Sequence, residues 1–402
     1  MACRMREVWI TGLGVVGPHG LGTGELMASA AANRSVFTPW PSDQNPPSES
    51  ALIGTVQAYP KERFFTERQL RLLDRPMTMS VCAVGLALDD AGFGDDLDRD
   101  NVATFLSTTR SEHASVVRFM TPLMLGKPRS LNPAQFPMIA RNISCGQVAI
   151  TFGLRGPSTV LASGSNAGLE AVCRAFEFIR SGRSRVAVVG SVEVLSKFAL
   201  FMSRALYREH LHSPKPAFFG RGPGLLVPSE GACMLVMEDA DYARARNAKP
   251  YARIDGYYAG RAGQAGRTRS LIDAWSKLLA RVNADPAAIG VFCLSSGGSN
   301  RLHEAAETDA LSEYYAHHRS TAAACAPRAF VGEGESWTGA LQVGLAAAMV
   351  RESIVPPMRN LADDKPGIIP VTAEPTRLSS PTAVVSSMDR SGAYSVLHLS
   401  GC

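Results

Sequence analysis

A turn of small residues near the middle of the chain places serine hydroxyls where a nucleophile would stand. Residues 156–172 read GPSTVLASGSNAGLEAV, so an extended segment leads through Ser163 and Ser165 into a helix expected over residues 162–181. A side chain at the start of a helix gains from the helix dipole, which stabilises developing negative charge. The hydrolase elbow G-x-S-x-G is absent. Spacing alone therefore favours a serine that caps the helix.

A second motif, Gly12-x-Gly14-x-x-Gly17, follows a short apolar strand over residues 8–11. A dinucleotide site would need a helix beginning at the third glycine and an acidic residue at the end of the next strand. The chain continues instead with Pro18 and His19, and the first acid at a suitable spacing, Asp43, falls in a proline-rich loop. The pattern is therefore interpreted as a tight glycine turn, and no cofactor is expected.

Composition and cysteine spacing exclude several classes of protein. The chain has 402 residues, 46% hydrophobic and 19% charged, with a net charge of +5. This is typical of a packed soluble protein, and the scattered arginines form no stripe for nucleic acid. The eight cysteines stand singly, which argues against a zinc site or a disulfide framework and favours a reducing cytoplasm. No leader peptide or membrane span is expected.

Strands alternate with helices along the chain, and the second half repeats the first. The apolar segment 289–296 (IGVFCLSS) matches 102–109 (VATFLSTT), and the helix expected over 339–351 matches the one after Gly164. Such alternation predicts a parallel-rich sheet in a layered α/β fold. We expect two similar halves, residues 1–237 and 238–402.

Several stretches, in the same order from end to end, resemble the β-ketoacyl synthase family of the thiolase-like superfamily. They are VWITGLGVVGPHG at 8–20, GPSTVLASGS at 156–165, IRSGRSRVAVVG at 179–190, SEGACMLVME at 229–238, ARARNAKPYARIDGY at 243–257 and IVPPMRN at 354–360. The resemblance implies a thiolase-like fold with duplicated α/β halves in five layers, α/β/α/β/α.

The resemblance also identifies three positions at which this chain departs from the family's Cys–His–His catalytic set. Counting from Gly156 places Ser165 at the nucleophilic cysteine. The first histidine falls on Ser296, and PRAFVGE at 327–333 places Arg328 at a lysine and Glu333 at the second histidine. The glycine-rich loop of the family is replaced by MDRSGAY at 388–394.

These departures predict that ordinary condensation fails. A thiolate accepts an acyl group readily, whereas a serine hydroxyl needs an adjacent base. Ser296 is a weak neutral donor, and an ionised Glu333 would repel the carbanion formed by decarboxylation. One alternative is an acyltransferase or hydrolase that uses Ser165, with Glu333 or a histidine as its base. Histidines considered for this role are His113, His303, His317 and His318.

The preferred interpretation is that the chain resembles a chain length factor, the inactive ketosynthase sister of type II polyketide synthases. The resemblance implies a heterodimer with an active ketosynthase, an acyl carrier protein as a further partner, and a role in shaping the chain tunnel. Phe119, Met120 and Arg328 are the candidate tunnel or interface residues. For Phe119 and Met120, ordinary dimer core is the alternative. A homodimeric acyl-binding or regulatory protein is the remaining alternative.

Overall fold

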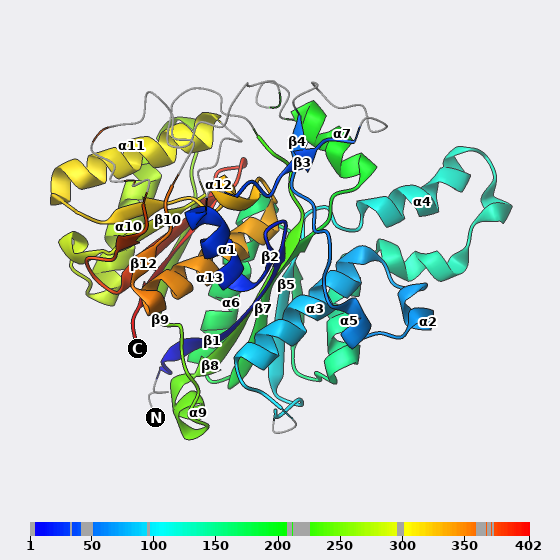
Figure 1. Ribbon diagram of the computed structural model, residues 1–402, viewed down its shortest axis with the longest axis horizontal. Coiled ribbons are helices and arrows are strands. Elements are labelled where there is room, and N and C mark those ends of the chain that lie inside the picture. Colours follow the sequence, from blue (N-terminus) through cyan, green and yellow to red (C-terminus); the bar gives the residue numbers. More distant parts are fainter. Residues whose placement is uncertain are drawn as a thin grey trace.

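The computed structural model describes residues 5–32, 34–41, 51–94, 97–206, 211, 226–295, 301–358, 367, 371 and 374–402, with backbone alone at 264 and 301–304. Within them lies one large mixed sheet, flanked and crossed by helices (Figure 1). Its ten main strands are β1 (Val8–Gly17), β5 (Val102–Ser107), β6 (Ser158–Leu161), β7 (Val186–Glu193), β8 (Gly231–Asp239), β9 (Ala252–Arg261), β10 (Val291–Leu294), β11 (Ala323–Cys325), β14 (Thr382–Met388) and β15 (Ala393–Ser400).

The two halves of the sheet have the same topology. The strands run in the order β11-β10-β14-β15-β9-β1-β8-β7-β5-β6. If each half is numbered along its own five strands, both halves read 3-2-4-5-1 from the outer edge inward. In both, the three outer strands are parallel to one another and the two inner pairings are antiparallel. The predicted duplication is confirmed, while the exact boundary after residue 237 stays a prediction.

The two halves join through the first strand. Val8–Ile10 of β1 pair with Ala252–Ile254 of β9 on one edge and with β8 on the other, so the sheet is continuous. The short β2 (Gly20–Leu21) pairs with the end of β1. Two small ribbons lie apart from the sheet, formed by β3 (Thr38–Pro39) with β4 (Leu52–Ile53) and by β12 (Ile354–Val355) with β13 (Thr376–Arg377).

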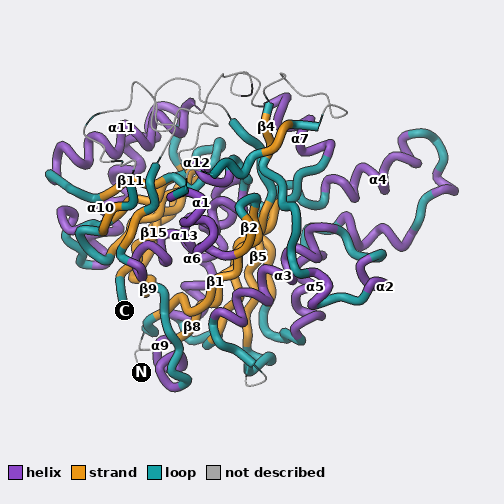
Figure 2. Tube along the Cα trace, viewed as in Figure 1, coloured by secondary structure: helices purple, strands orange, loops and turns teal. Residues whose placement is uncertain are grey.

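Helices cover both faces of the sheet and fill the space between its halves (Figure 2). The central pair is α6 (Ala167–Arg180) and α13 (Ser336–Glu352), which pack on each other and on strands of both halves. Residues 336–350 of α13 are all buried, as expected of a helix that is apolar on every side. The outer layers are α3 (Arg75–Asp90) with α5 (Ile143–Phe152), and α10 (Arg267–Val282) with α11 (Arg301–His318). This is the predicted five-layered arrangement.

The expected glycine turn after the first strand is wrong, because β1 continues through all three glycines and is buried along its length. A Cβ on Gly12 would lie 2.2 Å from the carbonyl oxygen of Ala87, and one on Gly14 would lie 1.9 Å from that of Ala83. Both acceptors belong to α3. The glycines therefore allow a helix to pack directly on the strand.

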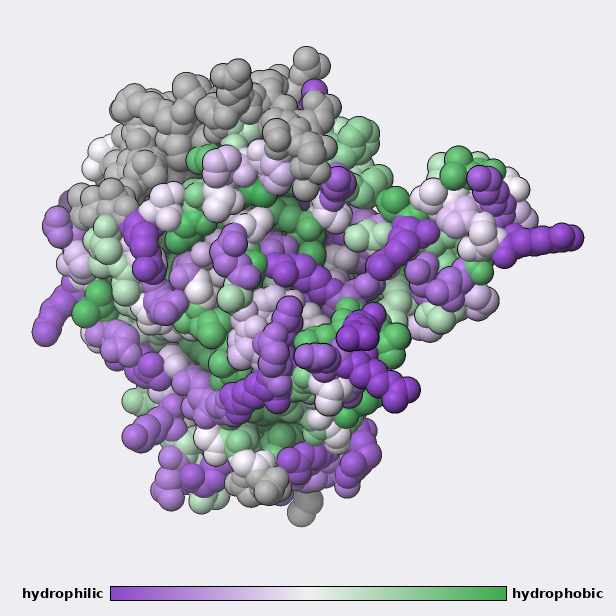
Figure 3. Space-filling model, turned by 45° about the vertical axis from the view of Figure 1, so that its right-hand side comes forward, coloured by the Kyte–Doolittle hydropathy of each residue, from purple (hydrophilic) through white to green (hydrophobic). Residues whose placement is uncertain are grey.

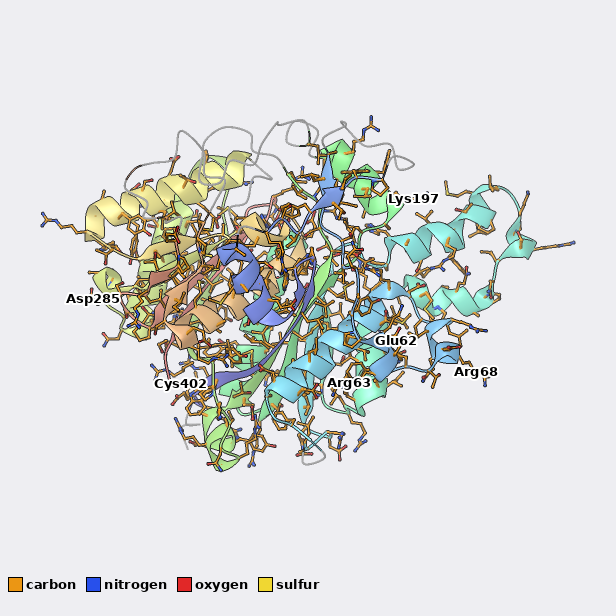
Figure 4. The ribbon with its side chains drawn as sticks, viewed as in Figure 1. Glu62, Arg63, Arg68, Lys197, Asp285 and Cys402 are labelled. Atoms are coloured by element: carbon orange, nitrogen blue, oxygen red, sulfur yellow. The ribbon has the colours of Figure 1, made fainter. Side chains whose placement is uncertain are left out.

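A long arm, residues 113–142, projects from one side of the body (Figure 1). It consists of α4 (His113–Met124) and two short 3-10 turns, Pro128–Ser130 and Pro133–Ile139. The other α-helices among the described residues are α1 (Gly22–Ala31), α2 (Glu67–Leu70), α7 (Lys197–Leu206), α9 (Ala240–Ala245) and α12 (Arg328–Val331). Figure 4 labels Lys197, at the start of α7, above the base of the arm in that view and Arg68, in α2, below it.

Candidate active site

Ser165 lies at the predicted junction between an extended segment and a helix. β6 ends at Leu161, and a 3-10 turn, Gly164–Asn166, leads into α6. The side chain is buried, with 8% of the residue exposed. Its backbone N–H and its hydroxyl both donate to one oxygen, Oδ2 of Asp389, at 3.1 and 3.3 Å. Ser165 is therefore held by a carboxylate rather than by a histidine or by Glu333.

Asp389 lies in the four-residue loop between β14 and β15, and this loop is internally tied. The backbone N–H of Asp389 donates to Ala393 O at 2.7 Å, and the N–H of Gly392 donates to Asp389 O at 2.8 Å. The second carboxylate oxygen, Oδ1, accepts from the N–H of Ser391 at 2.7 Å. Both oxygens of the carboxylate are therefore engaged, one by its own loop and one by Ser165.

A buried arginine supports the same loop from α10. Nη2 of Arg267 donates to Arg390 O at 2.7 Å, and 4% of Arg267 is exposed. Burial lowers the pKa of Arg267, and the carboxylate of Asp389 opposes that shift. The loop between β14 and β15 is thus fixed by a cation next to the carboxylate that faces Ser165.

Arg328 and Glu333, the predicted counterparts of a lysine and a histidine, form a buried ion pair. Nη1 of Arg328 lies 3.0 Å from Oε2 of Glu333, and the two side chains are 8% and 6% exposed. Oε1 of Glu333 accepts from the backbone N–H of Glu335 at 2.9 Å. The charge of Glu333 is therefore compensated by Arg328, and the predicted repulsion of a carbanion by Glu333 stays a prediction.

A second network, absent from the sequence prediction, connects the Ser165 turn to the start of α13. Glu193, at the end of β7, accepts from the backbone N–H groups of Thr109 and Arg110 and from the hydroxyl of Ser336 at 2.6 Å. Thr109 Oγ1 also donates to Gly164 O at 3.3 Å. Burial raises the pKa of the Glu193 carboxyl. The network fixes the backbone around the turn.

The remaining predicted residues are placed as follows. Ser296 lies outside the described residues; its neighbour Ser295 donates to Oε1 of buried Glu307 at 2.9 Å. Phe119 and Met120 lie on α4 in the arm, where the Phe119 ring contacts Phe136 at 5.9 Å between centroids and Met120 is 38% exposed.

The histidines considered as bases make other contacts. The ring of His113 meets Phe198 edge-on at 5.3 Å, and burial lowers the pKa of His113. His317 and His318 lie at the end of α11, where His318 packs on Tyr314. The backbone of His303 lies in α11.

Other kinds of site find no support in the part of the chain that the structure describes. No cluster of three or more potential metal ligands occurs there. Seven cysteines are described, and all are free. None of the described helices is both long enough and apolar enough to cross a bilayer.

The five-layered arrangement, with Ser165 in the turn that leads into α6, is a thiolase-like fold. The model of the β-ketoacyl synthase N-terminal domain matches residues 5–243, and that of the C-terminal domain matches residues 251–362. The chain belongs to the β-ketoacyl synthase family.

Several of the similar proteins are named for polyketide synthesis. The tetracenomycin polyketide synthase ketoacyl synthase beta subunit of Streptomyces glaucescens is 28% identical over 97% of both chains. The oxytetracycline polyketide putative β-ketoacyl synthase 1 of Streptomyces rimosus is 24% identical over 95% of this chain and 94% of its own. Among solved structures, the ishigamide ketosynthase/chain length factor is similar with a TM-score of 0.86 and 21% identity, covering 99% of this chain and 100% of its own.

Proposed function

We propose that this chain is a non-catalytic ketosynthase-like subunit that pairs with an active ketosynthase and shapes the tunnel for the growing chain. The observation that carries the proposal is which residues stand at the positions of the family's cysteine and second histidine. Where the family has a thiol there is the hydroxyl of Ser165, bound to Asp389, and where it has an imidazole there is Glu333, bound to Arg328. Neither position offers a nucleophilic thiolate or an imidazole to stabilise a carbanion.

The arm supports the pairing. It presents apolar side chains to solvent, among them Met124 at 82%, Leu125 at 65% and Phe136 at 62% exposure. Figure 3 shows hydrophobic residues at the top of the arm in that view, next to hydrophilic ones. Exposed apolar patches of this kind mark protein–protein contacts, and obligate interfaces bury large apolar areas. Phe119 and Met120 lie on the same helix, so a partner that packs on α4 would bring its own surface next to these candidate tunnel residues.

The names of the relatives point in the same direction. One is a beta subunit of a ketoacyl synthase, and one similar structure is a ketosynthase with its chain length factor. By analogy, this chain would form a heterodimer with an active ketosynthase, and an acyl carrier protein would deliver the acyl groups. The halves 1–237 and 238–402 and a cytoplasmic location are part of the same proposal.

The test is reconstitution. The full chain is co-expressed with a ketosynthase homologue that retains Cys, His and His, and the complex is sized by light scattering. We expect a 1:1 heterodimer that extends malonyl units, and no condensation by this chain alone with malonyl and acyl carrier proteins. Condensation by the isolated chain contradicts the proposal. A stable homodimer that ignores the ketosynthase supports instead a homodimeric acyl-binding or regulatory protein.

One observation favours a second candidate, a Ser165 acyltransferase or hydrolase. Oδ2 of Asp389 accepts a hydrogen bond from Ser165 Oγ at 3.3 Å, so this carboxylate could serve as the base for the hydroxyl. Intact-mass spectrometry after exposure to acyl thioesters separates the two candidates. An acyl adduct that disappears in Ser165→Ala and in Asp389→Asn supports the enzyme, whereas no adduct on the parent chain supports the non-catalytic subunit.

A further inference from the structure

We infer that Asp389 is a built-in plug: its carboxylate occupies the place where an acyl group would bind, so the loss of the family's cysteine is not the only reason that this site is silent. The inference deepens the proposed function, since it rests on the chain being non-catalytic. It concerns a residue outside the three catalytic positions and assigns to it the exclusion of acyl groups.

The plug uses the donors that an acyl oxyanion would need. The N–H and the hydroxyl of Ser165 converge on a single oxygen of Asp389, at 3.1 and 3.3 Å. An acyl group attached at position 165 would place its carbonyl oxygen near that N–H, which lies at the start of α6. Oxyanion stabilisation requires free donors at such a point, and the helix dipole attracts any anion there. The protein supplies the anion itself.

The side chain and the backbone of Asp389 are both held by its own loop. Oδ1 of Asp389 is bound by the N–H of Ser391, and the loop closes through the bond between Gly392 and Asp389. Gly392 has φ +86°, and a Cβ there would lie 2.1 Å from Ala262 O, so the loop packs tightly on the end of β9. A swing of Asp389 away from Ser165 would break these contacts.

The lack of a side chain at Gly164 leaves room for the carboxylate of Asp389. It has φ +74°, a conformation that favours glycine, and a Cβ at this position would lie 2.2 Å from Oδ2 of Asp389. Any other residue would meet the carboxylate. The turn at Gly164 and the β14–β15 loop therefore fit closely against each other, although Ser165 and Asp389 are 224 residues apart in the sequence.

A restored thiol would remain unreactive next to this carboxylate. A nearby like charge disfavours the thiolate, which is the form that attacks an electrophile. The carboxylate also occupies the space of the incoming group. Removal of the charge, and then of the whole side chain, is expected to restore reactivity in two steps.

The experiment uses the full-length chain in four variants: S165C, S165C/D389N, S165C/D389G and the matched control S165C/D241N. Asp241 is 80% exposed by its side chain and pairs with Arg244, away from the site. Iodoacetamide is the probe at pH 7.5, and tandem mass spectrometry separates the introduced thiol from Cys173, which lies in the same tryptic peptide, 156–174. We expect D389N to accelerate alkylation at position 165 by about tenfold or more, D389G to accelerate it further, and D241N to leave it unchanged.

The outcomes separate the inference from the proposed function. Equal rates with and without Asp389, including no measurable reaction in any variant, overturn the plug, because the carboxylate then does not control access. Thermal melting and co-purification with the active ketosynthase are measured on the same variants, so a folding defect is recognised. If alkylation is independent of Asp389 while pairing persists, the inference fails and the proposed function stands.

Discussion

The buried ion pair between Arg328 and Glu333 allows a quantitative test of the degenerate site. Glu333→Gln removes the negative charge but preserves an oxygen that accepts the bond from Glu335, so the change isolates the electrostatic contribution. Both side chains are less than one-tenth exposed. Removing one member of a buried pair leaves an uncompensated charge and costs about 3–5 kcal/mol.

The magnitude translates into a measurable melting shift. For a chain of 402 residues, the unfolding entropy of about 2.1 cal/mol/K per residue gives about 0.8 kcal/mol/K. A loss of about 3 kcal/mol then lowers Tm by about 3–4 °C. The double variant Arg328→Met with Glu333→Gln is expected to recover most of this loss, because neither charge of the pair remains.

The assay is differential scanning calorimetry of the parent chain, the two single variants and the double variant, analysed as a double-mutant cycle. Arg155→Met serves as the control, since its pairing with Asp100 is exposed and contributes little. The reasoning is refuted if Glu333→Gln melts with the parent chain, or if the double variant is as unstable as the sum of the singles.

Three further expectations follow from single residues. Burial lowers the pKa of His19 from 6.5 to about 4. Because the folded state binds that proton more weakly than the unfolded state, the free energy of unfolding is expected to fall as the pH drops from about 6.5 to 4. Denaturant titrations should show a smaller fall in the His19→Gln variant. Gly164→Ala should lower Tm more than Gly22→Ala, since both have positive φ but nothing lies within 4 Å of a Cβ on Gly22; equal losses in calorimetry would contradict the close fit. Met124→Glu should weaken co-purification with the ketosynthase without changing the chain's own Tm, whereas Leu72→Glu, 70% exposed outside the arm, should not; unchanged pairing would remove the arm from the interface.

The layered fold was predictable because its signals are local. Apolar runs such as residues 102–106 and 186–189 became buried strands, and the small-residue turn before α6 placed Ser165 at a helix start, as expected. The duplication was visible as two similar strand–helix patterns and reappears as two identical strand orders. Periodicity and turn chemistry suffice for such features.

Contacts across the chain were not predictable in the same way. Asp389 was noted only as part of an unusual loop, because its bond to Ser165 depends on how two distant loops meet. Glu193 was missed for the same reason, since its partner Ser336 lies on the other half. Gly12 and Gly14 were misinterpreted because close packing on α3, rather than a turn, requires them. A single sequence carries no direct sign of these approaches.

The position of β1 has a consequence for manipulating this protein. Val8–Ile10 are bonded to β8 on one side and to β9 on the other, so these three residues splice two otherwise separate sheets. Deleting the first ten residues would therefore break the continuous sheet between β8 and β9 and expose one edge of each strand, and exposed strand edges are prone to aggregation. A tag joined to the amino end therefore needs a spacer that leaves Val8–Ile10 able to pair with both strands.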